Sequence, residues 1–318
     1  AILVEYKSNL GKAMFVSHQW LTATHPDPTC QQLKVLQTAL KNVFSGSCKI
    51  RCDVTLEFRW GRNGYSQGEL KAAPIFVWYD YFSCPQPMAD QMSKVKSIVF
   101  NPLEDLRRAI ASIPAYVASC HFFVALCPML QTDGIELNQY TWARRGWCRA
   151  EKMAWELSDR HGLVLMVDSP EHLTLLPVWE SFQTSPGDGE FSVPSDIEVV
   201  GEIMRSLLRT KLQGFLQKGD LHNYRFYLNQ QRIRFRNCLI EPLDALIPEL
   251  PGAEILEAFF HQNGFLSIRD RDQAGWSPIC YAAMNGDPQL VEALLSNGAD
   301  PNDCIFHPKS EALIYAGT

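Results

Sequence analysis

The sequence predicts an α/β domain, with a parallel sheet and helices on both faces, followed by an α-helical region. Four short apolar runs have the length of strands that are buried on both faces, and helical patterns lie between them. Strands that alternate with helices in this way form parallel sheets through right-handed crossovers. Downstream of about residue 250 the pattern changes to that of paired helices with small residues between them.

The predicted strands cover residues 13–16, 75–79, 122–127 and 163–167. The clearest helix follows Asp27, a suitable N-cap, with Pro28 at the first helical position and apolar residues on one face. Further helices are expected over residues 145–158 and 195–217. The segment 48–73 is too long and too polar for a tight connection, so we interpret it as an insertion with residues 53–60 as one arm of a hairpin.

Composition restricts the class of protein. The 318 residues allow two domains, and 46% apolar with 20% charged residues is typical of a globular chain. A net charge of −6 disfavours general nucleic-acid binding. The longest apolar run, residues 120–130, contains His121 and Pro128, and no signal peptide is recognisable, so no membrane segment is expected. Ten scattered cysteines favour a reducing, cytoplasmic compartment, and a lone close pair, Cys48 and Cys52, predicts no metal site.

Three motifs follow one another in the first half of the chain. They are FVSHQW at 15–20, VWYDYFS at 77–83 and GWCRAE at 146–151. In this order and spacing they resemble a divergent TIR domain of the NAD-cleaving type. The resemblance covers about residues 10–215 and implies a flavodoxin-like parallel sheet, in a domain that we place at residues 10–218. The third motif resembles the Trp-Cys-x-x-Glu segment that opens the helix with the catalytic glutamate.

The first two motifs place polar and aromatic residues at one edge of the predicted sheet. Ser17, His18 and Trp20 follow the first strand, while Asp80 and Phe82 follow the second. Ligands of parallel sheets collect beyond the carboxyl ends of the strands, so these five residues are candidates for substrate binding. For Asp80, a capping or turn role is equally open. A serine triad is excluded, because adjacent strand residues point in opposite directions and no Gly-x-Ser-x-Gly elbow exists.

The third motif supplies the candidate catalytic group. Trp147 and Glu151 are four residues apart on a predicted helix and therefore share a face. The resemblance implies that Glu151 is catalytic, that Trp147 contacts the substrate, and that NAD⁺ is the substrate, with no cofactor required. A carboxylate suits this task because it stabilises an oxocarbenium-like state. Two alternatives remain open: a salt bridge from Glu151 to Arg145 or Arg149, and a core position for Trp147.

The departures from the TIR pattern concern diphosphate recognition and assembly. Gln19 and Trp20 stand where many members carry basic residues, so the donors to a diphosphate would be Arg144, Arg145 or Arg149. TIR domains commonly self-associate through the loop that follows the aspartate motif. The same behaviour is expected here, with an unusual proline-containing loop at residues 83–87.

The region from residue 251 to residue 318 resembles ankyrin repeats. The segment DQAGWSP at 272–278 and the segment GADPN at 298–302 fall at ankyrin positions, which predicts one full repeat over about residues 270–302. Residues 255–269 and 311–316 resemble parts of flanking repeats. A single repeat cannot bury its apolar face alone, so it either packs on the upstream region or continues in further repeats. Residues 219–250 are interpreted as an amphipathic connector, in preference to a nucleic-acid-binding segment.

These expectations combine into one leading hypothesis and one rival. The leading hypothesis is an intracellular signalling protein whose TIR-like domain hydrolyses NAD⁺ through Glu151 and whose ankyrin repeats bind other proteins. The rival is a non-catalytic scaffold that uses both domains as docking surfaces. A nucleotide-binding module without turnover is a lesser option, because the chain has no phosphate-binding loop.

Overall fold

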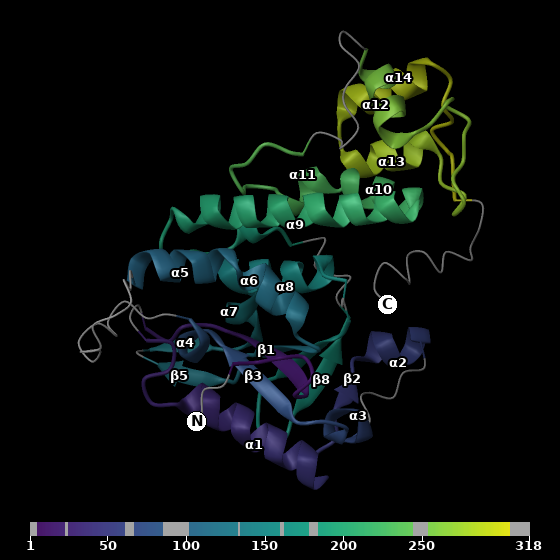
Figure 1. Ribbon diagram of the computed structural model, residues 1–318. Helices are drawn as coiled ribbons and strands as arrows, with labels where there is room; N and C mark the ends of the chain where they lie inside the picture. Colours follow the sequence, from purple (N-terminus) through teal and green to yellow (C-terminus); the bar gives the residue numbers. More distant parts are fainter. Residues whose placement is uncertain are drawn as a thin grey trace. The chain divides into compact units, whose positions relative to one another are not determined.

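The computed structural model describes residues 5–22, 25–60, 67–84, 102–132, 134–159, 162–177, 184–243 and 254–305 (Figure 1). The chain divides into two compact units. The N-terminal unit comprises Ala1–Val178 and Gly189–Pro194, and the C-terminal unit comprises Trp179–Asp188 and Ser195–Thr318. Each unit is described separately below.

A six-stranded sheet organises the N-terminal unit. Its strands are β1 (Lys12–His18), β2 (Arg51–Cys52), β3 (Ile75–Tyr79), β4 (Phe122–Leu126), β7 (Val164–Val167) and β8 (Leu173–Leu176), in the spatial order β2-β8-β7-β4-β1-β3. All neighbouring pairs are parallel except β7 and β8. Five residues separate these two strands, and a parallel crossover needs a dozen or more, so β8 returns antiparallel. The α/β class with a mainly parallel sheet is thus confirmed, although the sheet is mixed.

Helices lie on both faces of this sheet (Figure 1). They are α1 (Gln31–Ser45), α2 (Val54–Trp60), α3 (Gln67–Lys71), α4 (Asp80–Ser83), α5 (Pro102–Ala111), α6 (Ile113–Ser119), α7 (Gln139–Arg144) and α8 (Gly146–Leu157), and a small hairpin of β5 (Leu130–Thr132) and β6 (Ile135–Leu137) precedes α7. Alternate residues of β1 face opposite layers. Met14 and Val16 belong to the same buried cluster as Leu36 of α1. Phe15 stacks on Phe123, which in turn stacks on Trp155 of α8.

Two local predictions require correction. Helix α1 begins at Gln31, not at Pro28, yet Asp27 still caps it, because its carboxylate accepts from the backbone N–H groups of Gln31 (2.7 Å) and Leu33 (2.9 Å). Residues 54–60 form helix α2 and not the arm of a hairpin. The carboxylate of Asp53 accepts the backbone N–H of Thr55 at 2.8 Å, which satisfies a donor at the start of this helix.

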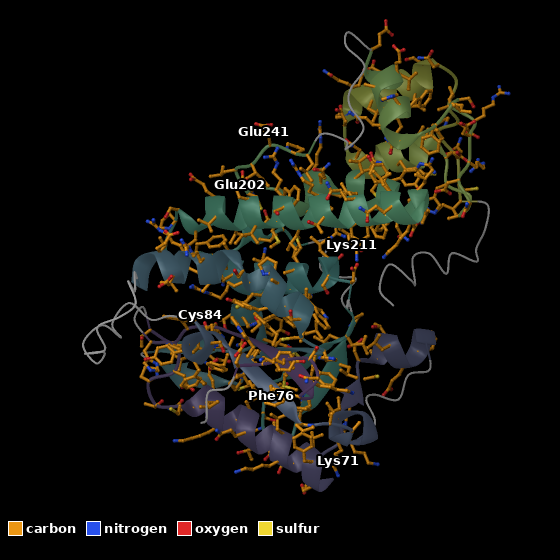
Figure 2. All side chains as sticks on the ribbon, in the orientation of Figure 1. Lys71, Phe76, Cys84, Glu202, Lys211 and Glu241 are labelled. Carbon is orange, nitrogen blue, oxygen red and sulfur yellow. The ribbon has the colours of Figure 1, made fainter. Side chains whose placement is uncertain are left out.

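The C-terminal unit is helical where the structure describes it. Its elements are the 3₁₀ turn η3 (Pro186–Asp188) and the helices α9 (Asp196–Lys218), α10 (Leu221–Leu228), α11 (Gln231–Arg234), α12 (Ile255–Asn263), α13 (Pro278–Asn285) and α14 (Pro288–Ser296). Lys211 of α9, marked in Figure 2, is buried, with its ammonium 5.4 Å from the centre of the Phe215 ring. Helices α13 and α14 pack around buried Tyr281 and Leu294. Within the described ranges, no helix has the length and apolarity needed to cross a membrane.

Candidate functional site

Asp80 organises the carboxyl edge of the sheet. The register pairs Val16 of β1 with Tyr79 of β3, so the residues that follow these two strands are neighbours. The Asp80 carboxylate is hydrogen-bonded to His18 Nε2 at 2.8 Å and accepts Trp20 Nε1–H at 2.7 Å and the backbone N–H of Tyr81 at 2.5 Å. Burial alone would raise the pKa of Asp80, but His18, Trp20 and Tyr81 together hold it below its ordinary value. Asp80 is therefore a carboxylate whose charge is already satisfied.

The aromatic residues of this edge differ in their exposure. The His18 side chain is only 1% exposed and stacks on the Tyr79 ring, with 4.1 Å between ring centres. Trp20 is 38% exposed and Phe82 is 41% exposed, and the Phe82 ring contacts the Tyr79 ring. The structure thus brings three predicted binding residues, His18, Trp20 and Phe82, to one edge. It leaves Trp20 and Phe82 accessible to a ligand and His18 covered.

Ser17 points away from His18, toward the layer of α7 and α8. It is fully buried, and its hydroxyl accepts the Trp142 Nε1–H at 3.1 Å. The same hydroxyl lowers the pKa of two neighbouring groups, the Glu151 carboxyl and the Cys148 thiol. Ser17, which the sequence suggested as a substrate contact, is therefore enclosed by other side chains and does not reach solvent.

Glu151 lies in the second turn of α8 and is half-buried. The pKa of Glu151 is raised from the ordinary 4.5 to about 8. Burial is the largest cause, the Ser17 hydroxyl acts against it, and the charge of Asp80 adds to it. No ion pair involving Glu151 is found in the part of the chain that the structure describes. Arg149 donates from Nε to the Ala143 carbonyl at 2.6 Å.

Two other arginines near the start of α8 also make interactions of their own. Arg144 forms an ion pair with Glu190 at 2.5 Å, and Arg145 donates to the Ser192 hydroxyl at 2.5 Å. Two of the three proposed diphosphate donors are thus tied to residues 189–194 of the same unit. Trp147 is half-buried, one turn before Glu151 on α8.

The remaining titratable groups of the site are thiols. Burial, with a smaller contribution from Asp80 and Glu151, raises the pKa of Cys84, marked in Figure 2, to about 12. Burial likewise raises the pKa of Cys148, whose Sγ donates to the His18 carbonyl at 3.7 Å. Both thiols are neutral at physiological pH. Asp80 is therefore the charged group that acts on Glu151, and its charge raises the pKa of Glu151.

Sequence reasoning missed the residues that connect this site to α7. Gln19 Nε2 donates to the Thr141 hydroxyl at 3.0 Å, and Asn138 and Thr141 form a capping box at the start of α7. These contacts hold Trp142 against the end of β1. The capping pattern of Asn138 and Thr141 is visible in the sequence and could have predicted the helix start, but no sequence signal points from Trp142 to Ser17.

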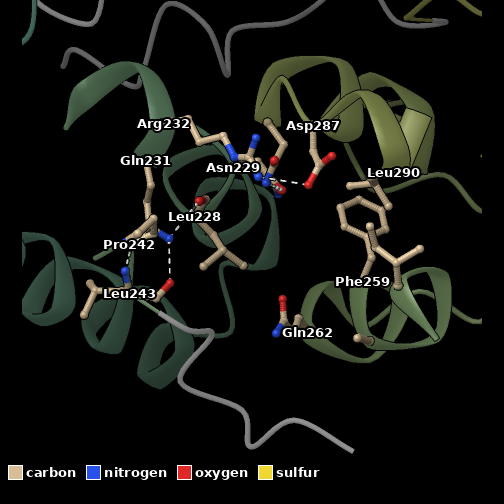
Figure 3. A pocket seen from close by; sticks show the side chains of 13 residues that line it. Leu228, Asn229, Gln231, Arg232, Pro242, Leu243, Phe259, Gln262, Asp287 and Leu290 are labelled. Carbon is tan, nitrogen blue, oxygen red and sulfur yellow. Dashed lines mark hydrogen bonds and ion pairs between the residues drawn. The ribbon is translucent and has the colours of Figure 1, made fainter. Parts of the chain in front are cut away.

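The C-terminal unit contains a pocket of about 300 Å³ among α11, α12 and α14 (Figure 3). Leu228, Phe259 and Leu290 supply apolar surface, and an ion pair between Arg232 and Asp287 (2.9 Å) lies at its wall. A separate buried network joins α10 to the repeat. In it, Asp272 contacts His222 Nδ1 at 2.7 Å and accepts the Tyr281 hydroxyl.

Comparison with known proteins identifies part of the C-terminal unit. A family model described as Ankyrin repeat matches residues 274–305, which include α13 and α14. This match confirms the ankyrin part of the sequence prediction and supports protein–protein interaction. Comparison with curated proteins and with solved structures finds no matching relative. In the described ranges, no three His, Cys, Asp or Glu side chains are grouped so that they could hold a metal ion.

Proposed function

We propose that the N-terminal unit is a divergent TIR-like domain that hydrolyses NAD⁺ to nicotinamide and ADP-ribose products, and that the ankyrin region binds a partner protein in intracellular signalling. One observation carries the catalytic part. Glu151 is a half-buried carboxyl group with a raised pKa and without a cationic partner among the described residues, next to the carboxyl edge where ligands of parallel sheets bind. The strand order β3-β1-β4-β7 adds support, because the central strands of flavodoxin-like sheets follow the same order.

The reaction assigns a role to each accessible group. The glycosidic C–N bond breaks, its electron pair stays on the nicotinamide nitrogen, and positive charge develops on the ribose. The Glu151 carboxylate stabilises this charge, and water then bonds to the ribose carbon and loses a proton. The exposed faces of Trp20 and Phe82 offer planar surfaces to the ligand, and Asp80 fixes the Trp20 ring through its N–H.

The charge state of Glu151 determines when this mechanism operates. With a pKa of about 8, the free protein holds Glu151 mainly protonated at pH 7. The positive nicotinamide ring favours the anion, as any nearby opposite charge does. In the free enzyme, kcat/KM should accordingly rise with pH through about 8.

The test is nicotinamide release by the 318-residue chain at high concentration, with and without a crowding agent that promotes self-association. Glu151→Gln should abolish release, while Glu57→Gln, the same change at an exposed position on α2, should leave it unchanged. Circular dichroism of each variant confirms folding. Undiminished turnover by folded Glu151→Gln would remove Glu151 from the mechanism.

A non-catalytic scaffold is the second candidate. The ankyrin match favours it, as does the burial of Ser17 and His18, which are 0% and 6% exposed and so offer little surface to a ligand. In this case both units are docking surfaces, and concentrated wild-type protein releases no nicotinamide under any condition. That result would favour the scaffold.

A further inference from the structure

We propose that residues Gly189–Pro194, the strap, are an autoinhibitory segment that engages the cationic and N–H groups at the start of α8 until an anionic ligand displaces it. This regulation rests on the proposed function, because a diphosphate is the anion that NAD⁺ would bring to these groups. Binding of the strap at α8 and its displacement can both be measured without any turnover.

The strap pairs with the backbone where α7 ends and α8 begins. The Glu190 N–H donates to the Arg144 carbonyl at 2.7 Å, and the Gly146 N–H donates to the Glu190 carbonyl at 2.9 Å, so that Arg145 and Glu190 form a parallel bridge. Gly146 is the first residue of α8, and the N–H groups at the start of a helix have no partner within the helix. Such donors bind anions, and the strap engages one of them.

The side chains of the strap supply the kind of acceptor that a diphosphate would supply. The Glu190 carboxylate forms an ion pair with Arg144 at 2.5 Å, and the Ser192 hydroxyl accepts from Arg145 at 2.5 Å. Carboxylate and phosphate oxygens match the same donor geometry of a guanidinium group. An anionic ligand must therefore compete with the strap for both arginines.

The polar contacts of the strap are weak enough to be exchanged. The Arg144 side chain is 66% exposed and the Glu190 side chain is 52% exposed, and ion pairs with this exposure contribute little stability. They still form, because a carboxylate on the same chain competes at a high effective concentration. The Phe191 ring packs on Gly146 so closely that an added Cβ would lie 2.1 Å from it, which fixes the strap over the start of α8. A ligand with more negative charge than Glu190 can take over Arg144 and Arg145.

The test is binding of inorganic pyrophosphate to the full chain, measured by isothermal titration calorimetry. Pyrophosphate has the diphosphate but no glycosidic bond, so the result does not depend on turnover. Glu190→Gln should tighten binding about two- to fivefold, the range that corresponds to one exposed ion pair. In a chain that also contains Arg144→Gln, the same change should have no effect, since the competing pair is already lost.

Glu57→Gln is the matched control. It makes the same change of net charge at an exposed position on α2 and should leave the affinity for pyrophosphate unchanged. Hydrogen exchange followed by mass spectrometry gives a second measurement on the wild type. Pyrophosphate should speed exchange in the strap, because the displaced Glu190 N–H loses its bond to the Arg144 carbonyl.

The outcomes separate the strap from the proposed hydrolysis. Equal affinity of the wild type and Glu190→Gln, no pyrophosphate binding by either, or bound pyrophosphate that leaves exchange in the strap unchanged would each overturn the autoinhibition. Tighter binding by Glu190→Gln in a protein that never releases nicotinamide would support the strap and refute the hydrolysis. Nicotinamide release together with an affinity that Glu190→Gln does not change would overturn the strap alone.

Discussion

Replacing Glu151 by glutamine should stabilise the N-terminal unit, and the gain should grow with pH. The folded state holds Glu151 protonated up to about pH 8, whereas the unfolded chain releases this proton near the ordinary value of 4.5. A group with a raised folded pKa contributes stability below its unfolded pKa and loses it as pH rises through the folded value. Glutamine is nearly isosteric with protonated glutamic acid but has no proton to lose, so it escapes this loss.

The magnitude follows from the difference between the two pKa values. Each pH unit between 4.5 and 8 costs the wild type about 1.4 kcal/mol of unfolding free energy. The variant should therefore gain about 1 kcal/mol at pH 5, about 3 kcal/mol at pH 7 and about 5 kcal/mol above pH 8. For a unit of this size, 3 kcal/mol corresponds to a rise in melting temperature of about 6–12 °C.

The assay is thermal and urea unfolding of wild type and Glu151→Gln, followed by tryptophan fluorescence at several pH values between 5 and 9. Glu57→Gln, at an exposed position, serves as the control and should give parallel curves at every pH. A gain for Glu151→Gln that does not vary with pH, or a loss of stability at pH 8, would refute the reasoning. A gain that is independent of pH would mean that folding does not raise the pKa of Glu151. A loss at pH 8 would mean that Glu151 is ionised and well satisfied in the folded protein.

Three further predictions concern other contacts. Asp80→Asn should lower the unfolding free energy of the N-terminal unit by about 2 kcal/mol at pH 7. Because the pKa of Asp80 is lowered in the folded state, the stability difference between wild type and variant should shrink in acid. Trp20 fluorescence should report a more mobile indole, since its N–H loses the carboxylate acceptor. Asp272→Asn should weaken the ankyrin region by about 2 kcal/mol at pH 7 and by less near pH 3, as measured by urea unfolding, since the pKa of Asp272 is also lowered. Gly146→Ala should cost about 1–3 kcal/mol, because the added Cβ would lie 2.1 Å from the Phe191 ring, and Phe191→Ala in the same chain should remove most of that cost, as a double-mutant cycle would show.

The sequence predicted the four longer parallel strands and missed the short ones. The predicted strands at 122–127 and 163–167 match β4 and β7 closely, because a continuous apolar run is the direct result of burial on both faces. The strand at 75–79 matches β3, although Val77 in it is 44% exposed. Strand β2 has two residues and β5 and β6 have three each, too few to produce a pattern. The helix at 54–60 was missed because its start depends on the cap at Asp53, and the glycines after it suggested a turn.

The sequence placed Ser17, His18, Trp20 and Asp80 near one edge of the sheet, but it did not predict their contacts. Strand alternation already required Ser17 and His18 to point in opposite directions. Only the packing of α7 shows that Ser17 is sealed by Trp142, and only the pairing of β1 with β3 shows that His18 and Trp20 share Asp80. Such contacts join residues 60 or more positions apart, and local pattern contains no information on them.

The two carboxyl groups of the site are kept in opposite environments, and this difference separates their functions. Asp80 receives three donors and stays charged, so it is suited to holding His18 and Trp20 in fixed positions. Burial and the charge of Asp80 raise the pKa of Glu151 more than the Ser17 hydroxyl lowers it, so the charge of Glu151 depends on what is bound beside it. When two neighbouring acids have pKa values that are driven apart in this way, one commonly stays charged and positions other groups, while the other changes its protonation state during the reaction. It follows that a cationic ligand is the one able to ionise Glu151 near neutral pH, whereas a neutral ligand of the same shape would leave the proton in place.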